Sequence, residues 1–69
     1  MKHNQMLYLA RRLHLPNGKV LERYVVLVRD GMVLEWHPFE HESQSMILVE
    51  ELYAGKGANG ALVLESVNL

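Results

Sequence analysis

Two histidines, His37 and His41, lie four residues apart beside the carboxylates Glu40 and Glu42, and imidazole and carboxylate groups are common zinc ligands. Histidines at this spacing bind one metal from the same face of a helix, but Pro38 leaves His37 outside any such helix. In an extended strand the two residues would lie about 13 Å apart. We expect a solvated polar loop and no metal site, with a looped two-histidine site as the alternative.

Side chains that could act as nucleophiles or hold phosphate do not occur in the patterns that these reactions need. The chain has no cysteine, and none of Ser43, Ser45 and Ser66 lies between the flanking glycines of a nucleophile elbow. The glycine-rich segment 55–60 lacks the spacing and the Lys-Ser/Thr ending of a phosphate-binding loop, and no dinucleotide-binding glycine pattern is present. We therefore expect a protein that is not an enzyme, with no catalytic residue and no cofactor.

Arginines and tyrosines occur together in the first half of the chain. Arg12 and Tyr24, with further arginines on neighbouring predicted strands, could present cations beside stacking surfaces, as small β-barrels do for single-stranded nucleic acid. Residues 1–29 hold six basic residues and one acidic residue, and such an excess can indicate a basic surface for nucleic acid. Against this interpretation stand the net charge of −1 and the acidic second part, in which residues 30–69 hold seven acidic residues and one basic residue. We expect the acidic part to lie beside the basic part, within one fold or across a dimer, and keep nucleic-acid binding as the alternative function.

Turn signals divide the first half of the chain into three strands. Leucines recur with a period of two before Pro16-Asn17-Gly18, which is typical of a three-residue hairpin loop. Asp30-Gly31 is typical of a two-residue type I′ turn, which needs positive φ at both residues. These signals predict a three-stranded antiparallel meander. Its predicted strands are residues 6–15, 19–29 and 32–37.

The two turns also predict which side chains share a face. A two-residue loop sets Leu27 opposite Leu34, and Val25 opposite Trp36, while the three-residue loop adds the leucines of the first strand to the same side. We predict that this face is the core. Its residues are Leu7, Leu9, Leu13, Leu21, Val25, Leu27, Met32, Leu34 and Trp36. Arg11 would then face Arg23, and a bulge or bend there would relieve the repulsion.

The opposite face of the meander is too apolar to remain in water. We expect residues 46–67 to cover it in the same chain, or a second copy of the chain to do so, and pairing of open strand edges is a further route to a dimer. Six residues of this face form the predicted interaction surface: Tyr8, Arg12, Tyr24, Val26, Val28 and Val33.

The second half of the chain is less regular. Residues 44–50 suit either a helical turn or a strand, and we favour the helical turn because Ser43 or Ser45 could cap it. Strands are predicted at 52–54 and 61–67, on either side of the glycine-rich loop. The sequence thus predicts one mainly β domain over residues 1–69, with α+β as the alternative class.

Size and composition set further expectations. A chain of 69 residues buries only about 60% of its unfolded surface, so a homodimer would supplement a small core. Without cysteine there is no disulfide framework, and we expect neither a signal peptide nor a membrane segment and place the protein in the cytoplasm. The predicted function is protein contact by self-association, with a homodimer as the expected partner state and no partner of another kind identified.

The segment Leu13–Leu21, followed by Val26–Leu34, resembles the opening strands of amidohydrolase-superfamily proteins, in which a short β-sandwich precedes a metal-bearing barrel. The resemblance implies a similar local meander. It carries over no catalytic residue, because His37 to His41 departs from the family's His-x-His motif and the residues that follow are too few to build a barrel. The whole chain also resembles short bacterial proteins that stand alone, which implies no particular activity.

Overall fold

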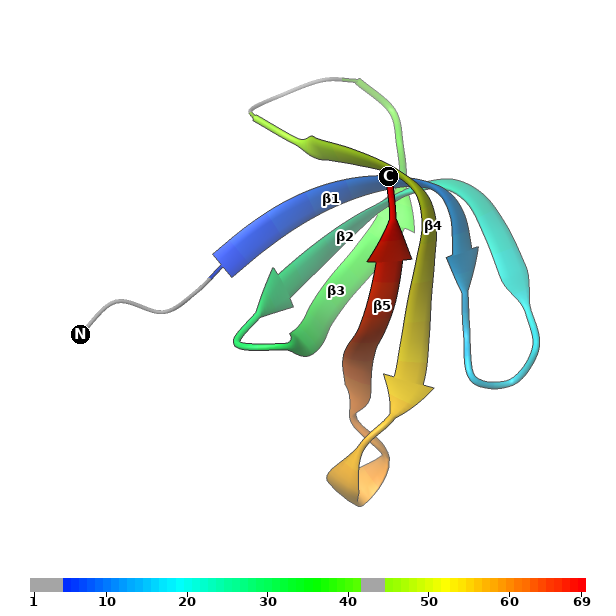
Figure 1. Ribbon diagram of the computed structural model, residues 1–69, viewed down its shortest axis with the longest axis vertical. Coiled ribbons are helices and arrows are strands. Elements are labelled where there is room, and N and C mark those ends of the chain that lie inside the picture. The colour runs from blue at the N-terminus through cyan, green and yellow to red at the C-terminus, as the bar shows by residue number, and fades with distance from the viewer. Residues whose placement is uncertain (1–4, 42–44) are drawn as a thin grey trace.

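A computed structural model describes residues 5–41 and 45–69 of the chain, and nearly all of its regular structure is β (Figure 1). Within these residues the strands are β1 (Gln5–His14), β2 (Val20–Arg29), β3 (Met32–Pro38), β4 (Ile47–Lys56) and β5 (Leu62–Asn68), with one 3-10 turn, η1 (Ala58–Gly60). The described part of the chain has no α-helix. The predicted mainly β class is confirmed, and α+β is wrong for these residues.

Both predicted turns are confirmed. Asp30 and Gly31 have φ of 51° and 81°, as a type I′ turn requires, and β2 pairs with β3 directly across them. In the first turn Gly18 has φ of 91° and its N–H donates to the Leu15 carbonyl at 3.0 Å. The pairing that follows sets Leu7 opposite Leu27, and Leu13 opposite Leu21, in the predicted register.

The five strands close into a barrel in the order β1-β2-β3-β5-β4. All neighbours are antiparallel except β1 and β4, which run parallel because the chain crosses over between β3 and β4 (Figure 1). Closure between β3 and β5 depends on one ladder pair, Met32 with Val63, and a hydrogen bond from the Leu64 N–H to the Gly31 carbonyl at 2.8 Å.

The prediction of a helical turn at residues 44–50 is wrong where the structure describes it. Residues 42–44 lie outside the described part, and Ile47 to Glu50 belong to β4. A tertiary contact explains why this segment is a strand. The edge of β1 that does not pair with β2 pairs with β4, with Tyr8 opposite Ile47. Backbone pairing of this kind outweighs the small helix propensity of a short segment. The predicted strands at 52–54 and 61–67 are confirmed, within the longer β4 and in β5.

The core lies on the face of the meander opposite to the one predicted. Residues of the predicted second face are buried, and β4 and β5 of the same chain cover them, so the covering by residues 46–67 is confirmed. The buried cluster is Tyr8, Ala10, Leu13, Val26, Val28, Val33, Val49, Leu52 and Ala54, with Leu15, Leu21, Tyr24, Leu62, Leu64 and Val67 packed against it.

Most of the predicted core residues lie elsewhere. Leu13 and Leu21 do belong to the core, and Val25 is buried but outside the central cluster. The remaining six are a correction: Leu7, Leu9 and Leu27 are half-buried, and Met32, Leu34 and Trp36 are exposed. The turns determine which residues share a face, but only the path of the second half of the chain determines which face becomes the interior.

A bulge in β3 also changes the predicted register of the second hairpin. Val28 pairs with Val33 as the turn requires, but beyond it Leu27 faces Glu35, which leaves Leu34 as the extra residue. Val26 therefore lies opposite Trp36. Since neighbouring residues of a strand point to opposite faces, Leu27 and Trp36 lie on opposite sides of the sheet, contrary to the prediction.

The predicted bend near Arg23 is confirmed, and it coincides with a change in which residues point inward. Arg23 has φ of 57°, and the ladders skip Arg11 on both sides of β1. Before this point Tyr8 and Ala10 are buried, and after it Leu13 is buried. The interruption leaves Arg11 and Arg23 out of the ladder, and the inward side of β1 shifts by one residue across it.

Candidate functional site

The residues predicted to form an interaction surface are mostly inside the barrel. Tyr24 is half-buried against the core, and Arg12 alone among the six has its side chain on the outer surface. The other four, Tyr8, Val26, Val28 and Val33, are buried. The prediction that these six share an accessible face is therefore wrong for this fold, because β4 and β5 occupy the space that a partner would fill.

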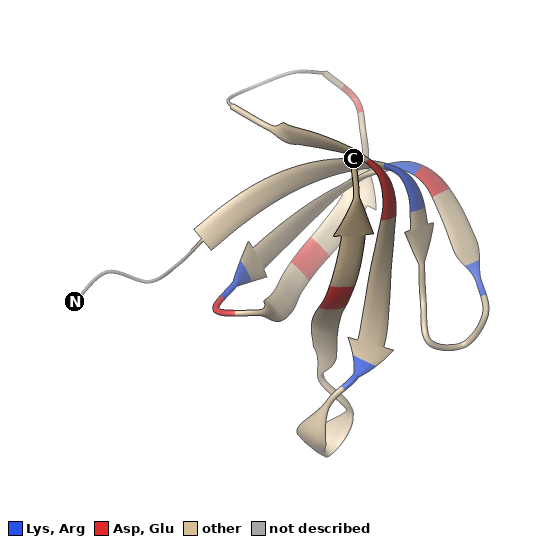
Figure 2. Ribbon diagram, in the orientation of Figure 1, with Lys and Arg blue, Asp and Glu red and all other residues tan. Residues whose placement is uncertain are grey.

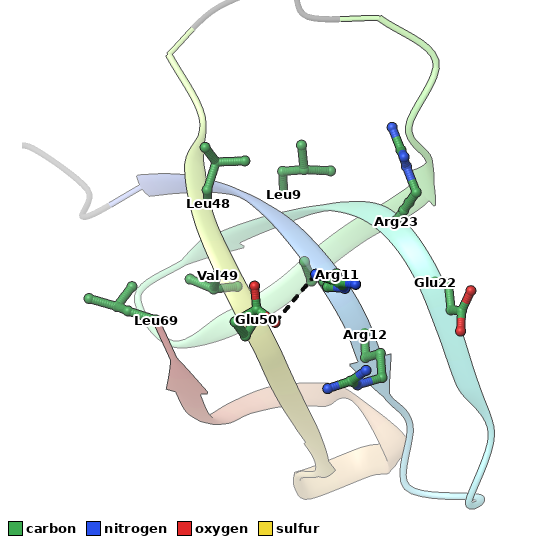
Figure 3. Close-up of a pocket in the computed structure, with 10 residues that line it drawn as sticks. Leu9, Arg11, Arg12, Glu22, Arg23, Leu48, Val49, Glu50 and Leu69 are labelled. Carbon is green, nitrogen blue, oxygen red and sulfur yellow. Dashed lines mark ion pairs between the residues drawn. The ribbon is translucent and has the colours of Figure 1, made fainter.

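An apolar surface on the outside of the sheet consists instead of three residues of the predicted core, together with one residue of β4. We call Leu7, Leu9, Leu27 and Leu48 the outer leucine face. Leu7 pairs with Leu27 across β1 and β2, and Leu9 pairs with Leu48 across β1 and β4. Leu48 is 68% exposed, the largest exposed fraction of any large apolar residue within a described strand. Figure 3 shows the Leu9 and Leu48 side chains on the same side of the sheet.

Charged residues border this face where the ladder is interrupted. A shallow cavity of about 670 Å³ there is lined by Leu9 and Leu48 together with the side chains of Arg11, Arg23 and Glu50 (Figure 3). Arg11 and Glu50 form an exposed ion pair at 3.8 Å. The guanidinium of Arg23 lies 5.7 Å from the centre of the Phe39 ring, within the range of a cation–π contact. The border thus places charges of both signs beside apolar side chains.

Beyond the interruption, the outer side of β1 and β4 has a polar network. Arg12 donates to Glu51 Oε2 through Nε at 2.8 Å and also through Nη2, and His14 Nε2 lies 2.6 Å from Glu51 Oε1. The His14 ring stacks on Tyr53 with centroids 4.2 Å apart and planes 11° apart. The Glu51 side chain is 16% exposed. This network of Arg12, His14, Glu51 and Tyr53 joins the two parallel strands.

The chemistry of this network is that of a structural ion pair. Hydrogen bonds from Arg12 and then from His14 lower the pKa of Glu51 to about 2, and the same pairing raises the pKa of Arg12. A carboxylate with so low a pKa is a weak general base near pH 7, because an effective base has a pKa close to the working pH. The arrangement fits a structural link between β1 and β4 better than a catalytic site.

Acidic and basic residues lie near one another where β1, β2 and β4 meet, whereas β3 and β5 contain acidic residues alone (Figure 2). The charge asymmetry of the sequence is compensated within the chain, since Arg11 and Arg12 of the basic part pair with Glu50 and Glu51 of the acidic part. This confirms that the two parts lie together in one fold.

Neither a metal site nor a membrane-spanning helix is found in the described part of the chain. His37 Nδ1 lies 3.1 Å from the carbonyl oxygen of its neighbour Pro38. Among residues 5–41 and 45–69, no three metal-ligating side chains of the His, Cys, Asp or Glu type form a group that could hold a metal ion. Nor does this part of the chain have a helix with the length and apolar character needed to cross a membrane.

Sequence reasoning missed Leu48 and Glu51 as surface residues. Both became recognisable only through the parallel pairing of β1 with β4, which sets Leu48 beside Leu9 and Glu51 beside Arg12. Residues 47–56 gave no clear local signal, because three apolar residues in a row, Ile47 to Val49, are followed by two glutamates. So short a window cannot distinguish a strand from a helix by its periodicity.

Comparisons with known proteins give no relative for this chain. No protein family, no curated protein and no solved structure matches it. The resemblance to amidohydrolase-superfamily strands thus stays a prediction, and the function is argued from the geometry alone.

Proposed function

We propose that this protein is a non-enzymatic β domain that acts through protein contact, and that it self-associates through the outer leucine face. The observation that supports the proposal is Leu48, which is 68% exposed beside the half-buried Leu9 on a regular, paired part of the sheet. Large apolar side chains that adjoin one another on a surface, with charged residues at the border, are typical of interaction sites. A cytoplasmic, bacterial protein remains our expectation.

Charge favours a second copy as the occupant of this face. Opposite charges border it, with Arg23 and Arg29 on β2, Glu35 on β3 and Glu50 on β4. In a two-fold interface the same patch faces itself, and the rotation brings each border residue against a different one, so arginines can meet glutamates. The net charge of −1 adds almost no repulsion between copies.

Barrel closure makes the face a better route to a dimer than a strand edge. β1 and β2 are each paired on both sides, so neither offers a free edge along its main ladders. Self-association through the apolar side chains of these strands leaves those hydrogen bonds intact.

Nucleic-acid binding receives less support from the geometry. Tyr8 is buried, Tyr24 packs against the core, and Arg12 is paired with Glu51. The aromatic rings of this surface are therefore not available for stacking on bases.

The test is sedimentation velocity over a range of protein concentrations, with Leu48→Asp as the disrupting variant. A carboxylate at this position would be buried without a partner in the dimer, and we expect the dimer to weaken by about tenfold or more. The exposed Leu48 side chain contributes little to the monomer, so circular dichroism should show an unchanged fold.

Val20→Asp is the matched control, because Val20 is 46% exposed and lies outside the outer leucine face. We expect it to leave the association constant unchanged. A wild-type protein that stays monomeric at millimolar concentration contradicts the proposal, and so does equal weakening by the two aspartates.

A further inference from the structure

A second apolar site lies beside the β1–β2 turn. It is a recess of about 450 Å³ between the β1–β2 turn, the middle of β3 and the adjoining ends of β4 and β5. Its lining residues are Leu15, Pro16, Asn17, Trp36, Lys56 and Leu62. Recesses of a few hundred Å³ with mostly apolar walls are the usual size for a small bound molecule.

The recess exists because β3 and β5 barely pair. Met32 and Val63 form the only ladder pair between them in the described chain, so β3 continues past this point without a β5 neighbour. The bulge at Leu34 then brings Trp36 opposite the fully buried Val26, on the inner side of the sheet. Trp36 remains 39% exposed there, because no β5 strand covers it.

The polar groups of the recess indicate which ligand it suits. Lys56 is exposed at the end of β4, and within residues 5–41 and 45–69 it forms no ion pair. Asn17 is the other polar residue of the lining, and its Oδ1 already accepts a hydrogen bond from the Lys19 N–H at 2.9 Å. One ammonium group beside indole, proline and leucine side chains complements a molecule with an apolar body and one negative charge.

We propose that this recess binds a small apolar carboxylic acid, with the apolar part against Trp36 and Leu62 and the carboxylate paired with Lys56. The site is independent of the proposed self-association, because it shares no residue with the outer leucine face. A bound acid would take the place beside β3 that β5 leaves open.

The experiment is a titration with octanoate below its micelle concentration, followed by the emission of Trp36, the only tryptophan of the chain. We expect a saturable blue shift as the acyl chain excludes water from the indole. The neutral analogue 1-octanol should bind more weakly. Lys56→Gln should weaken octanoate about threefold, the size expected for an exposed ion pair, whereas Lys19→Gln, a lysine outside the recess, should leave the affinity unchanged.

A backbone amide NMR titration of the wild-type protein locates the site without any substitution. Shifts concentrated at Leu15, Trp36 and Leu62 support the recess, and shifts centred on the outer leucine face overturn it. The proposal also fails if Trp36 emission does not respond, if octanol binds as tightly as octanoate, or if both lysine variants weaken binding equally. The Leu48→Asp variant should bind octanoate like the wild type, which separates this result from self-association.

Discussion

The two halves of β1 differ in the polarity of their outward side chains, although both halves pair with β4. Before Arg11 the outward residues Leu7 and Leu9 are apolar and lie in the outer leucine face. After Arg11 the outward residues Arg12 and His14 are polar and bond to Glu51. One interruption of the ladder is enough to move the outward positions from odd to even numbers.

The difference shows which half is available to a partner. The polar half satisfies its own hydrogen-bonding groups inside the chain, and among the described residues no buried side-chain polar atom lacks a partner. The apolar half leaves Leu48 in solvent, where a contact with another apolar surface would release water. We therefore expect the first half of β1 to contribute to self-association and the second half to contribute to the stability of the folded monomer.

The largest expected effect distinguishes the inner and outer sides of β4. Leu52→Ala removes a side chain that is fully buried, and we expect the free energy of unfolding to fall by about 2–5 kcal/mol. Leu48→Ala, on the outer side of the same strand, should change it by about 0.5 kcal/mol or less. Urea denaturation at a concentration that keeps the protein monomeric measures both. Similar losses at the two positions would contradict the assigned sides of β4.

The comparison also explains how much of the fold the sequence predicts. Turn chemistry is local, so Gly18, Asp30 and Gly31 predicted three strands and the first register correctly. The interior side of those strands depends on β4, which reaches β1 through a parallel pairing between residues 39 positions apart, such as Leu9 and Leu48. No local pattern specifies such a pairing, and alternation alone cannot distinguish the two faces of a strand when both are apolar.

The candidate sites depend still more on non-local structure. The side of the sheet on which Trp36 lies depends on the bulge at Leu34, and the sequence of a two-residue turn does not predict that bulge. Glu51 had no local partner in the sequence, since Arg12 lies 39 residues away. The bend at Arg23 was predictable, because like charges opposite each other at Arg11 and Arg23 are unfavourable in a regular ladder.

A smaller effect tests that bend. Arg23 has φ of 57°, a conformation that costs an L-residue about 1–2 kcal/mol and glycine almost nothing. We expect Arg23→Gly to be more stable than Arg23→Val by about 1 kcal/mol, with the loss of the Phe39 contact common to both variants. The free energy of unfolding from urea denaturation gives the difference.

The control for this prediction is the neighbouring position, where the ladder is regular. Glu22 pairs with Arg12 in an extended conformation, so valine should be more stable than glycine there. A preference for valine at both positions would mean that Arg23 does not hold a left-handed conformation, and the change of sides along β1 would lose its cause.

The smallest expected effect concerns the polar half and appears as pH dependence. The pKa of Glu51 is lowered from an ordinary value of 4.5 to about 2, mainly by the hydrogen bond from Arg12. A carboxylate with a lower pKa in the folded state stabilises the fold above its unfolded pKa, and this contribution is lost as the pH falls through the folded value. The melting temperature should therefore decrease between about pH 4.5 and pH 2, and less steeply in Glu51→Gln.

Glu50→Gln is the control, because it removes the same charge from an exposed ion pair whose distance to Arg11 is longer, at 3.8 Å. We expect this variant to keep the wild-type slope. If both variants reduce the pH dependence of the melting temperature equally, the effect comes from net charge, and the structural link between β1 and β4 makes no specific contribution.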